Sequence, residues 1–346
     1  MRNRRVHFVQ RPDGPVTPAC FDLRDAPVAA PADGDVLVRN IYLSCDPYMR
    51  GRMGGTANYP GLKHFDLDAV IPARVVGQVE ASRNPAFEAG DVVWGFLGWE
   101  LYSLARGGGD LRVVDPSLGP ISHAITAIGM PGLTARVGIL DIGKPKPGET
   151  VFVSAASGAV GQVAGQIAKL EGCRVVGSAG SDAKVAHIVD ALGFDAAFDY
   201  RTVPSLGAAL DEHCPDGIDV YFDNVGGETL EAALDRINPG ARIPVCGQIS
   251  QYDNAERFEP RNRANLEAKG ATMRKFSIYD HMDQYDAFLP WIAERIADGR
   301  IVYFEDIVDG IDNTVDAFIG MMRGENLGKR LVRVSDDPTL RPGPPS

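Results

Sequence analysis

The sequence has few cysteines, and they are not arranged to build a metal-binding lobe or a disulfide framework. The five cysteines, Cys20, Cys45, Cys173, Cys214 and Cys246, are dispersed, and no C-x-x-C pair occurs. The six histidines are equally scattered and form no H-E-x-x-H motif. We therefore predict reduced thiols in a reducing compartment and no bound metal.

Long apolar runs and an excess of positive charge are also missing. No hydrophobic segment approaches the ~20 residues that span a bilayer, and no signal-peptide core follows the basic N-terminus MRNRRVHFVQ. The chain carries 35 Lys and Arg against 46 Asp and Glu, a formal charge of -11. This balance argues against a broad surface for nucleic acid or anionic lipid. We expect a cytoplasmic protein that binds neither nucleic acid nor membrane.

The sequence does show a change of rhythm near residue 125. Up to that point, short β-rich segments alternate with turns that contain Gly and Pro. Beyond it, strand-like and helix-like segments alternate, which predicts a parallel sheet with helices on both faces. A last strand, helix and strand are too short to stand alone. We therefore predict an α/β protein with a discontinuous β-rich domain (1–125 and 305–346) and a doubly wound, Rossmann-type domain (126–304).

A glycine-containing turn lies at the first strand-to-helix junction of the second region, in VFVSAASGAVGQVAGQIAKLEG (151–172). The dinucleotide fingerprint G-x-G-x-x-G occurs here with Ala156 in the first place. Alanine is tolerated there if its φ is negative. Free N–H groups at the helix N-terminus would then bind an anion, and they belong to Gly158, Ala159, Val160 and Gly161. A purely structural turn is the alternative, but the βαβ context favours a dinucleotide.

The end of the second strand of this region favours NADP over NAD. NAD sites usually carry an acidic residue there for the ribose 2′-OH, whereas this strand ends in Gly177-Ser178-Ala179. Lys184, one turn into the next helix, is placed to pair with a 2′-phosphate, and Tyr200 could add a hydroxyl donor. Two alternatives stay open: Lys184 could be an ordinary solvated lysine, and Asp182 could bind a ribose or cap its helix.

Several longer blocks resemble one enzyme family. They are SCDPYMRGRM (44–53), GMPGLTA (129–135), AASGAVGQVAGQIAKLEGCRVVGSAGSDAKV (155–185), YFDNVGGE (221–228), CGQISQY (246–252) and GENLGKRLV (324–332). In order, they are similar to the zinc-independent medium-chain dehydrogenase/reductases. The nearest group contains the prostaglandin reductases, leukotriene B4 12-hydroxydehydrogenases and NADP-dependent alkenal double-bond reductases. The resemblance runs from about residue 5 to 334.

This resemblance implies a GroES-like catalytic domain beside the NADP-binding domain, and a homodimer. It also implies that NADPH reduces the C=C bond of α,β-unsaturated aldehydes or ketones, with hydride transfer to the β-carbon. Zinc-dependent relatives carry a G-H-E block where this chain has IPARVVGQV (71–79), and Cys45 lies near a zinc-ligand position without partners. A quinone reductase of the same superfamily and a non-catalytic NADPH-binding protein stay open as alternatives.

The same resemblance assigns candidate site residues. Tyr252 matches a tyrosine near the nicotinamide ribose, where a hydroxyl can stabilise the enolate that conjugate hydride addition creates. Tyr48 and Tyr59 match the substrate region, with packing as the alternative for both. Further cofactor contacts are expected at the ends of the fourth, fifth and sixth strands and in the C-terminal piece: Asn224, Cys246, Gly247, Ile249, Ser250, Phe276, Ser277, Ile278 and Asn326. For Asn224 and Asn326, turn chemistry is the alternative.

Overall fold

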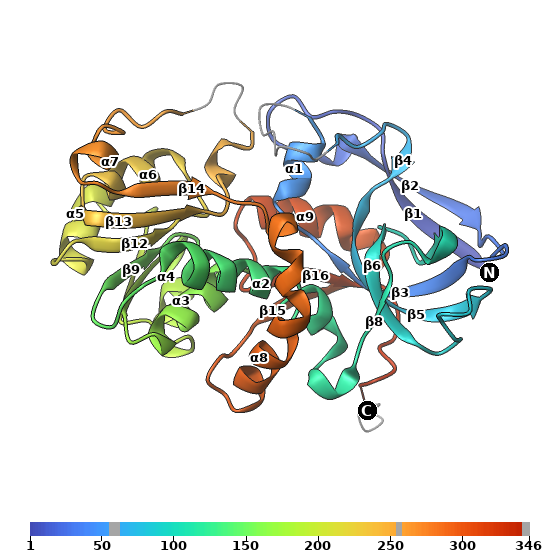
Figure 1. Cartoon of the computed structure of the whole chain (residues 1–346). Helices are drawn as coiled ribbons and strands as arrows, with labels where there is room; N and C mark the ends of the chain where they lie inside the picture. The colour runs from blue at the N-terminus through green and yellow to red at the C-terminus, as the bar shows by residue number, and fades with distance from the viewer. Residues whose placement is uncertain (55–62, 254–257, 341–346) are drawn as a thin grey trace. The chain divides into compact units, whose positions relative to one another are not determined.

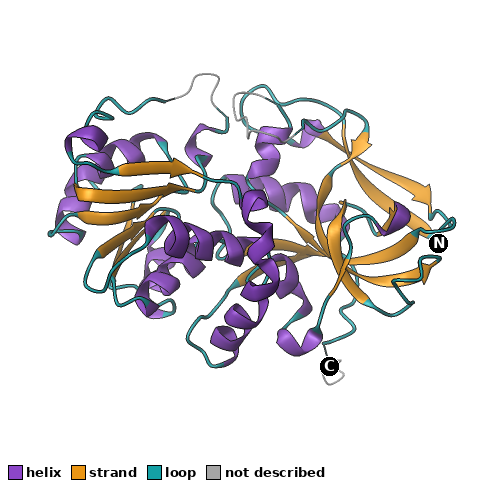
Figure 2. Cartoon of the chain, in the orientation of Figure 1, coloured by secondary structure: helices purple, strands orange, loops and turns teal. Residues whose placement is uncertain are grey.

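The computed structural model of the chain describes residues 1–54, 63–253 and 258–340. The chain divides into two compact units, one of Met1–Ile125 with Glu305–Ser346 and one of Thr126–Phe304. Strands dominate the first unit, whereas strands and helices alternate in the second (Figure 2). The α/β class, with a β-rich part and a Rossmann-like part, is thereby confirmed.

The first unit is built on a seven-stranded sheet (Figure 1). Its strands follow the order β15 (Glu305–Asp309), β16 (Lys329–Arg333), β3 (Val36–Ser44), β5 (Pro72–Ser82), β6 (Val92–Gly98) and β8 (Arg112–Val113), and β7 (Tyr102–Ala105) also pairs with β3. β16 runs antiparallel to β3, with Leu331 opposite Ser44. The C-terminal segment therefore completes the sheet of the N-terminal region.

A three-stranded sheet of β2 (Phe21–Pro27), β1 (Arg2–Phe8) and β4 (Ala69–Val70) adds to this unit. Aromatic rings fill the core, and Trp99 meets Phe318 of α9 (Thr314–Met322) edge-on at 5.6 Å between ring centroids. The short helix α1 (Tyr48–Arg52) follows β3 directly. A buried lysine holds its N-terminal end, since Lys329 Nζ donates to Asp46 Oδ1 at 2.8 Å.

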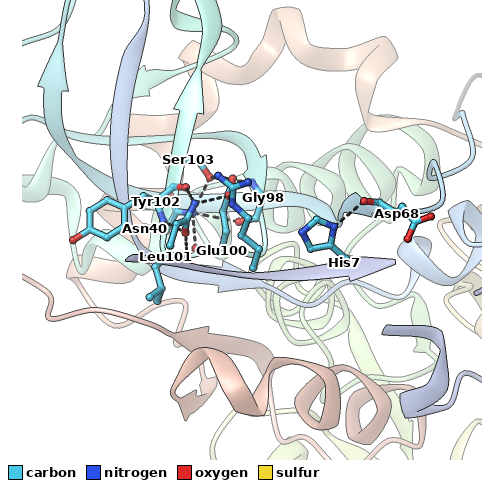
Figure 3. A network of polar contacts seen from close by, with 10 residues as sticks. His7, Asn40, Asp68, Gly98, Glu100, Leu101, Tyr102 and Ser103 are labelled. Carbon is cyan, nitrogen blue, oxygen red and sulfur yellow. Dashed lines mark hydrogen bonds and ion pairs between the residues drawn. The ribbon is translucent and has the colours of Figure 1, made fainter. Parts of the chain in front are cut away.

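A buried polar network joins β1 to the strands of the larger sheet (Figure 3). The carboxylate of Glu100 accepts from Ser103 Oγ and from Asn3 Nδ2, both at 2.9 Å. Arg5 adds an ion pair, with 3.1 Å between its Nε and Glu100 Oε2. Asn40 Nδ2 donates to the Glu100 carbonyl at 2.8 Å. Burial raises the pKa of Glu100 above its ordinary value despite these partners.

The second unit is organised around a six-stranded parallel sheet. The strand order is β11 (Ala196–Asp199), β10 (Arg174–Ala179), β9 (Thr150–Val153), β12 (Ile218–Phe222), β13 (Ile237–Val245) and β14 (Thr272–Lys275). In order of appearance within the unit this is 3-2-1-4-5-6, the order of dinucleotide-binding folds. Successive strands are added toward one edge from β9 to β11 and toward the other edge from β12 onward, so the order reverses between β9 and β12. Such a switch point opens a crevice at the carboxyl ends of the strands.

Helices cover both faces of this sheet (Figure 2). Adjacent residues of β9, such as Phe152 and Val153, point to opposite faces and are both fully buried. Phe152 stacks on Tyr221 of β12 at 5.0 Å. The connecting helices are α3 (Gly161–Leu170), α4 (Asp182–Asp190), α5 (Leu206–His213) and α6 (Gly227–Leu234), and α2 (Met130–Arg136), α7 (Asn265–Ala268) and α8 (Tyr285–Ala297) complete the unit.

Within residues 1–54, 63–253 and 258–340, no helix is both long and apolar enough to cross a membrane.

Candidate functional site

The turn after β9 has the backbone shape of a dinucleotide-binding loop. Ala155 has φ +48°, whereas Ala156 is absent from the positive-φ residues of the described chain. The condition for alanine in the first fingerprint position is therefore met. A Cβ on Gly161 would lie 2.4 Å from the carbonyl oxygen of Ala155. Only glycine allows this close approach of helix and turn, which is the role of the third fingerprint glycine.

One predicted anion donor is engaged within the turn itself. The N–H of Gly158 donates to the carbonyl of Ala155 at 3.0 Å, so its contact with a cofactor stays a prediction. Within the described chain, the N–H groups of Ala159, Val160 and Gly161 have no acceptor, at the start of α3. They retain the character of an anion site, since the first N–H groups of a helix have no partner within it.

The end of β12 carries a buried carboxyl group that shapes the next loop. Asp223 is fully buried, and its Oδ1 accepts from Tyr221 Oη at 2.6 Å and from the N–H of Gly226 at 2.8 Å. Its Oδ2 has no hydrogen-bond partner within the described structure. Burial raises the pKa of Asp223 above its ordinary value. Asp223 was not among the predicted site residues, although D-N-V-G-G has the composition of a side-chain-closed turn.

Asn224 is fixed in orientation by β9. Its Nδ2 donates to the carbonyl of Ser154 at 2.8 Å, and its N–H donates to Ser154 Oγ at 3.0 Å. With the amide nitrogen engaged, the side-chain oxygen is the group left to accept from a ligand. Ser154, which the sequence did not single out, therefore positions Asn224 across the switch point between β9 and β12.

The segment after β13 is hydrogen-bonded to the loop after β12. The N–H groups of Cys246 and Gly247 donate to the carbonyl of Asp223 at 2.8 and 3.1 Å. The N–H of Ile249 donates to the main-chain carbonyl of Asn224 at 3.3 Å, and Ser250 Oγ donates to the carbonyl of Val225 at 2.6 Å. Predicted residues from two separate blocks thus form one connected layer at this edge of the sheet. Burial raises the pKa of the Cys246 thiol to about 12.

Tyr252 ends this layer and is buried, with 5% of its surface exposed. The N–H of Gln248 donates to its hydroxyl oxygen at 3.5 Å. Burial raises the pKa of Tyr252 well above the ordinary tyrosine value. The hydroxyl therefore keeps its proton over a wide pH range and has the character of a hydrogen-bond donor.

The ends of β10 and β11 hold the two residues predicted for a 2′-phosphate. Tyr200 follows β11 directly, and its N–H donates to the carbonyl of Ala179 at 3.0 Å, which places it beside the end of β10. Lys184 lies in the first turn of α4. The cap of this helix is Ser181, whose Oγ accepts from the N–H of Lys184 at 3.4 Å. The alternative in which Asp182 caps the helix is therefore wrong, because Asp182 is the first helical residue.

The remaining predicted residues are distributed over both units. β14 ends at Lys275, so Phe276 and Ser277 follow the sixth strand instead of ending it, and Ile278 begins a 3-10 helix. Asn326 belongs to the first unit, where its Nδ2 donates to the carbonyl of Gly328 at 2.6 Å. This is the turn chemistry that the sequence left open for it.

The predicted substrate tyrosines belong to the first unit. Tyr48 is the first residue of α1 and packs against the core of that unit. Tyr59 lies outside the described residues. Cys45, which lies near a zinc-ligand position of the zinc-dependent relatives, is fully buried, and burial raises the pKa of its thiol to about 12. Across the described residues, no three or more His, Cys, Asp or Glu side chains gather as a metal site.

Comparisons with known proteins agree with this geometry. Residues 4–113 match a family described as the N-terminal domain of oxidoreductase, and residues 159–294 match one described as zinc-binding dehydrogenase. The chain belongs to the zinc-independent medium-chain dehydrogenase/reductases, which confirms the family predicted from the sequence.

Individual relatives match over most of their length. The chain is 44% identical over 302 residues to the NADP(+)-dependent 2-alkenal reductase of Nicotiana tabacum, covering 87% of this chain and 88% of that one. It is 40% identical over 342 residues to the NADPH-dependent curcumin reductase of Escherichia coli, covering 97% and 98%. The crystal structure of CurA from Vibrio vulnificus in complex with NADPH has a TM-score of 0.90 and 40% identity, covering 96% and 100%.

Proposed function

We propose that this protein uses NADPH to reduce the C=C bond of α,β-unsaturated aldehydes or ketones, without a metal. The observation that carries the proposal is the connected layer at the carboxyl edge of the parallel sheet. It joins the Asp223–Gly226 loop to the segment that ends in Tyr252. Relatives whose names state an alkenal or a curcumin reductase activity with NADP(H) share at least 40% of their residues with the chain.

The residues present fit NADPH. The unpaired N–H groups at the start of α3 suit the pyrophosphate, because an anion can accept from them. Glycine at position 161 lets the start of α3 lie close to the backbone of Ala155. Asn224, whose amide nitrogen is engaged by Ser154, offers its oxygen to a donor on the nicotinamide side. Lys184 and Tyr200 are proposed to contact the 2′-phosphate, which NADPH has and NADH lacks.

When bound, the cofactor supplies the hydride that adds to the β-carbon of the substrate. Conjugate addition moves negative charge to the carbonyl oxygen, and a donor aimed at that oxygen lowers the barrier. We assign this donor role to Tyr252. Because the pKa of Tyr252 is raised, its hydroxyl stabilises the enolate oxygen by hydrogen bonding and holds its own proton. The substrate contacts of Tyr48 and Tyr59 stay predictions from the family resemblance.

A substrate panel tests this function. Purified protein should oxidise NADPH with enals and enones, and more slowly with simple quinones and with saturated ketones. The products should be saturated carbonyl compounds, identified by mass spectrometry. Fast turnover of quinones with no turnover of any enal or enone would instead make the protein a quinone reductase, and binding of NADPH without turnover of any acceptor would make it non-catalytic.

Metal independence is a separate expectation. Chelation with EDTA and 1,10-phenanthroline should leave turnover unchanged, and elemental analysis should find less than stoichiometric zinc. The physical reason is that a hydrogen-bond donor, and not a Lewis acid, is assigned to the enolate oxygen. Stoichiometric zinc together with chelator-sensitive turnover would contradict the assignment.

We also propose a cytoplasmic homodimer. The location is the prediction from composition, and the assembly is the prediction from the family resemblance. β14 lies at one edge of the parallel sheet, and strand edges offer unpaired backbone groups to a partner. Light scattering at several protein concentrations tests the assembly, with a constant dimer mass as the expected result.

A further inference from the structure

Tyr200 and Arg201 converge on the end of β10. Gly180 is the first residue after that strand, and a Cβ built on it would lie 2.9 Å from Tyr200 Oη and 3.1 Å from Arg201 Nε. Both distances are shorter than ordinary van der Waals contact. The absence of a side chain at Gly180 is therefore what lets a hydroxyl and a guanidinium lie against the backbone here.

The end of β10 has a known role in dinucleotide-binding folds. The end of the second strand of a dinucleotide-binding sheet receives the adenosine ribose, whose 2′ substituent distinguishes NADP from NAD. β10 is the second strand, and the residues from Gly177 to Ser181 carry no carboxylate that could accept from a 2′-OH. A guanidinium at the same place matches a phosphate in charge and in its paired N–H geometry.

We propose that Arg201 is a specificity-determining residue that binds the 2′-phosphate of NADP(H), together with Tyr200. This inference rests on the proposed function and adds to it a cation that the sequence analysis did not identify. Arg201 lies directly after Tyr200, its guanidinium carbon is 5.7 Å from the centroid of the Tyr200 ring, and the residue is exposed. A ligand can therefore reach it.

The neighbouring charged groups agree with this role. Asp199 Oδ1 accepts from the main-chain N–H of Arg201 at 2.9 Å, so this carboxylate is engaged with the backbone. Lys184 contributes a second positive charge from the first turn of α4. Asp182 is exposed on the same turn and supplies the opposite charge. These two cations are balanced by the two carboxylates, so the assignment rests on the position of the Arg201 guanidinium at the end of β10 and not on net charge.

Binding measurements with matched ligands test the proposal. Calorimetry on the full chain would give dissociation constants for NADP+, NAD+, 2′,5′-ADP and 5′-AMP. Arg201→Ala should weaken NADP+ and 2′,5′-ADP by about tenfold to a hundredfold, as expected for a charge-assisted hydrogen bond. NAD+ and 5′-AMP, which lack the 2′-phosphate, should bind as they do to the unaltered protein.

Three further variants make the test specific. Arg300→Ala removes a surface arginine that pairs with Asp298 in the same unit and should leave all four constants unchanged. Arg201→Lys keeps the charge but not the paired N–H geometry and should recover part of the loss. Gly180→Ala should weaken NADP+ more than NAD+, because its Cβ would displace the Tyr200 hydroxyl and the Arg201 guanidinium.

The possible results separate this inference from the proposed function. If the unaltered protein prefers NADP+ and Arg201→Ala leaves that preference intact, the role of Arg201 is refuted while the function stands. An equal loss of affinity for all four ligands in Arg201→Ala would also refute it, because such a loss would not depend on the 2′-phosphate. If the unaltered protein binds NAD+ and NADP+ with equal affinity, the proposed preference for NADP(H) is itself refuted.

Discussion

Ala155 has an unusual conformation at a position where the chain turns from strand to helix. Its φ of +48° lies in the left-handed region, which costs an L-residue about 1–2 kcal/mol and glycine almost nothing. Strain of this kind persists where the surrounding structure determines the backbone, and it is common at binding sites. Here the carbonyl of Ala155 accepts from Gly158 and also limits what can stand at Gly161.

We therefore expect Ala155→Gly to stabilise the protein by about 1 kcal/mol, the relief of strain less the added entropy of the unfolded chain. Urea denaturation measures the difference. Ala183→Gly, on the exposed side of α4, is the matched control and should lose about 1 kcal/mol, since glycine in a helix only adds unfolded-state entropy. A loss of stability in both variants would show that Ala155 is not strained.

Tyr252 gives the sharpest test among single side chains. Tyr252→Phe removes the proposed donor to the enolate oxygen, so kcat should fall roughly tenfold to a thousandfold. The dissociation constant for NADPH should change little, because the backbone contacts of the layer remain. Tyr102→Phe, in the first unit, is the control and should leave kcat unaltered. An unchanged kcat in Tyr252→Phe would remove this residue from the mechanism.

The same residue makes a prediction for pH. The pKa of Tyr252 is raised above the ordinary 10.0 by burial, so its hydroxyl stays protonated throughout the neutral and mildly alkaline range. We expect no decline of kcat from ionisation of this tyrosine below about pH 10. A decline with an apparent pKa near 8 or 9 that is lost in Tyr252→Phe would contradict the assigned role.

Several of these residues could be found from sequence and others could not. Lys184, Tyr200 and Asn224 come after strands of a parallel sheet, whose carboxyl ends lie at one edge, so their position at that edge was predictable. Ser154 was missed because its importance lies in hydrogen bonds to Asn224, 70 residues further along the chain. Asp223 was missed because its burial depends on the packing of the sheet, although its bonds to Tyr221 and Gly226 are local. Arg201 was missed because only the register of β10 with β11 brings it to Gly180.

At the scale of elements, the alternation of strands and helices was predictable, whereas some boundaries were not. The apolar segment ARIPV (241–245) indicates a strand, but β13 begins earlier, at Ile237, and includes Pro239 and Gly240. Both residues ordinarily interrupt strands. They are accommodated because the pairing of β12 with β13 changes register between Ile218 and Val220, and an irregularity of this kind tolerates residues that a regular ladder excludes.

The network that joins β1 to the larger sheet predicts a measurable effect of pH. Burial raises the folded-state pKa of Glu100 above its unfolded value of 4.5. Between these two pKa values the folded state holds more protons than the unfolded state, so the contribution of Glu100 to stability decreases as pH rises through that window. Glu100→Gln retains the hydrogen-bonding shape without this titration.

We therefore expect the stability of Glu100→Gln, relative to the unaltered protein, to improve as pH rises from 4.5 to 7. Denaturant unfolding at several pH values measures the difference. Glu88→Gln, which removes an exposed carboxylate of the same unit, is the control and should show no such change with pH. A relative stability of Glu100→Gln that decreases over this range would mean that the Arg5 ion pair outweighs burial.

At the scale of the whole molecule, composition excluded classes of function more readily than it identified one. The charge of -11 and the dispersed cysteines argued against nucleic-acid binding and a cysteine-built metal lobe. The family was predicted from sequence blocks that occur in the same order over nearly the whole chain. A relative that is 40% identical over 342 residues confirms this prediction. The acceptor could not be predicted, because substrate shape depends on side chains that no motif specifies.

The central claim is conjugate reduction at the β-carbon, and cofactor labelled with deuterium at the transferring position tests it most directly. With an α,β-unsaturated ketone as substrate, NMR and mass spectrometry of the product locate the label. We expect a saturated ketone with deuterium on the β-carbon, because the developing charge is then placed on an oxygen that Tyr252 can stabilise. An allylic alcohol with deuterium on the carbonyl carbon would contradict it.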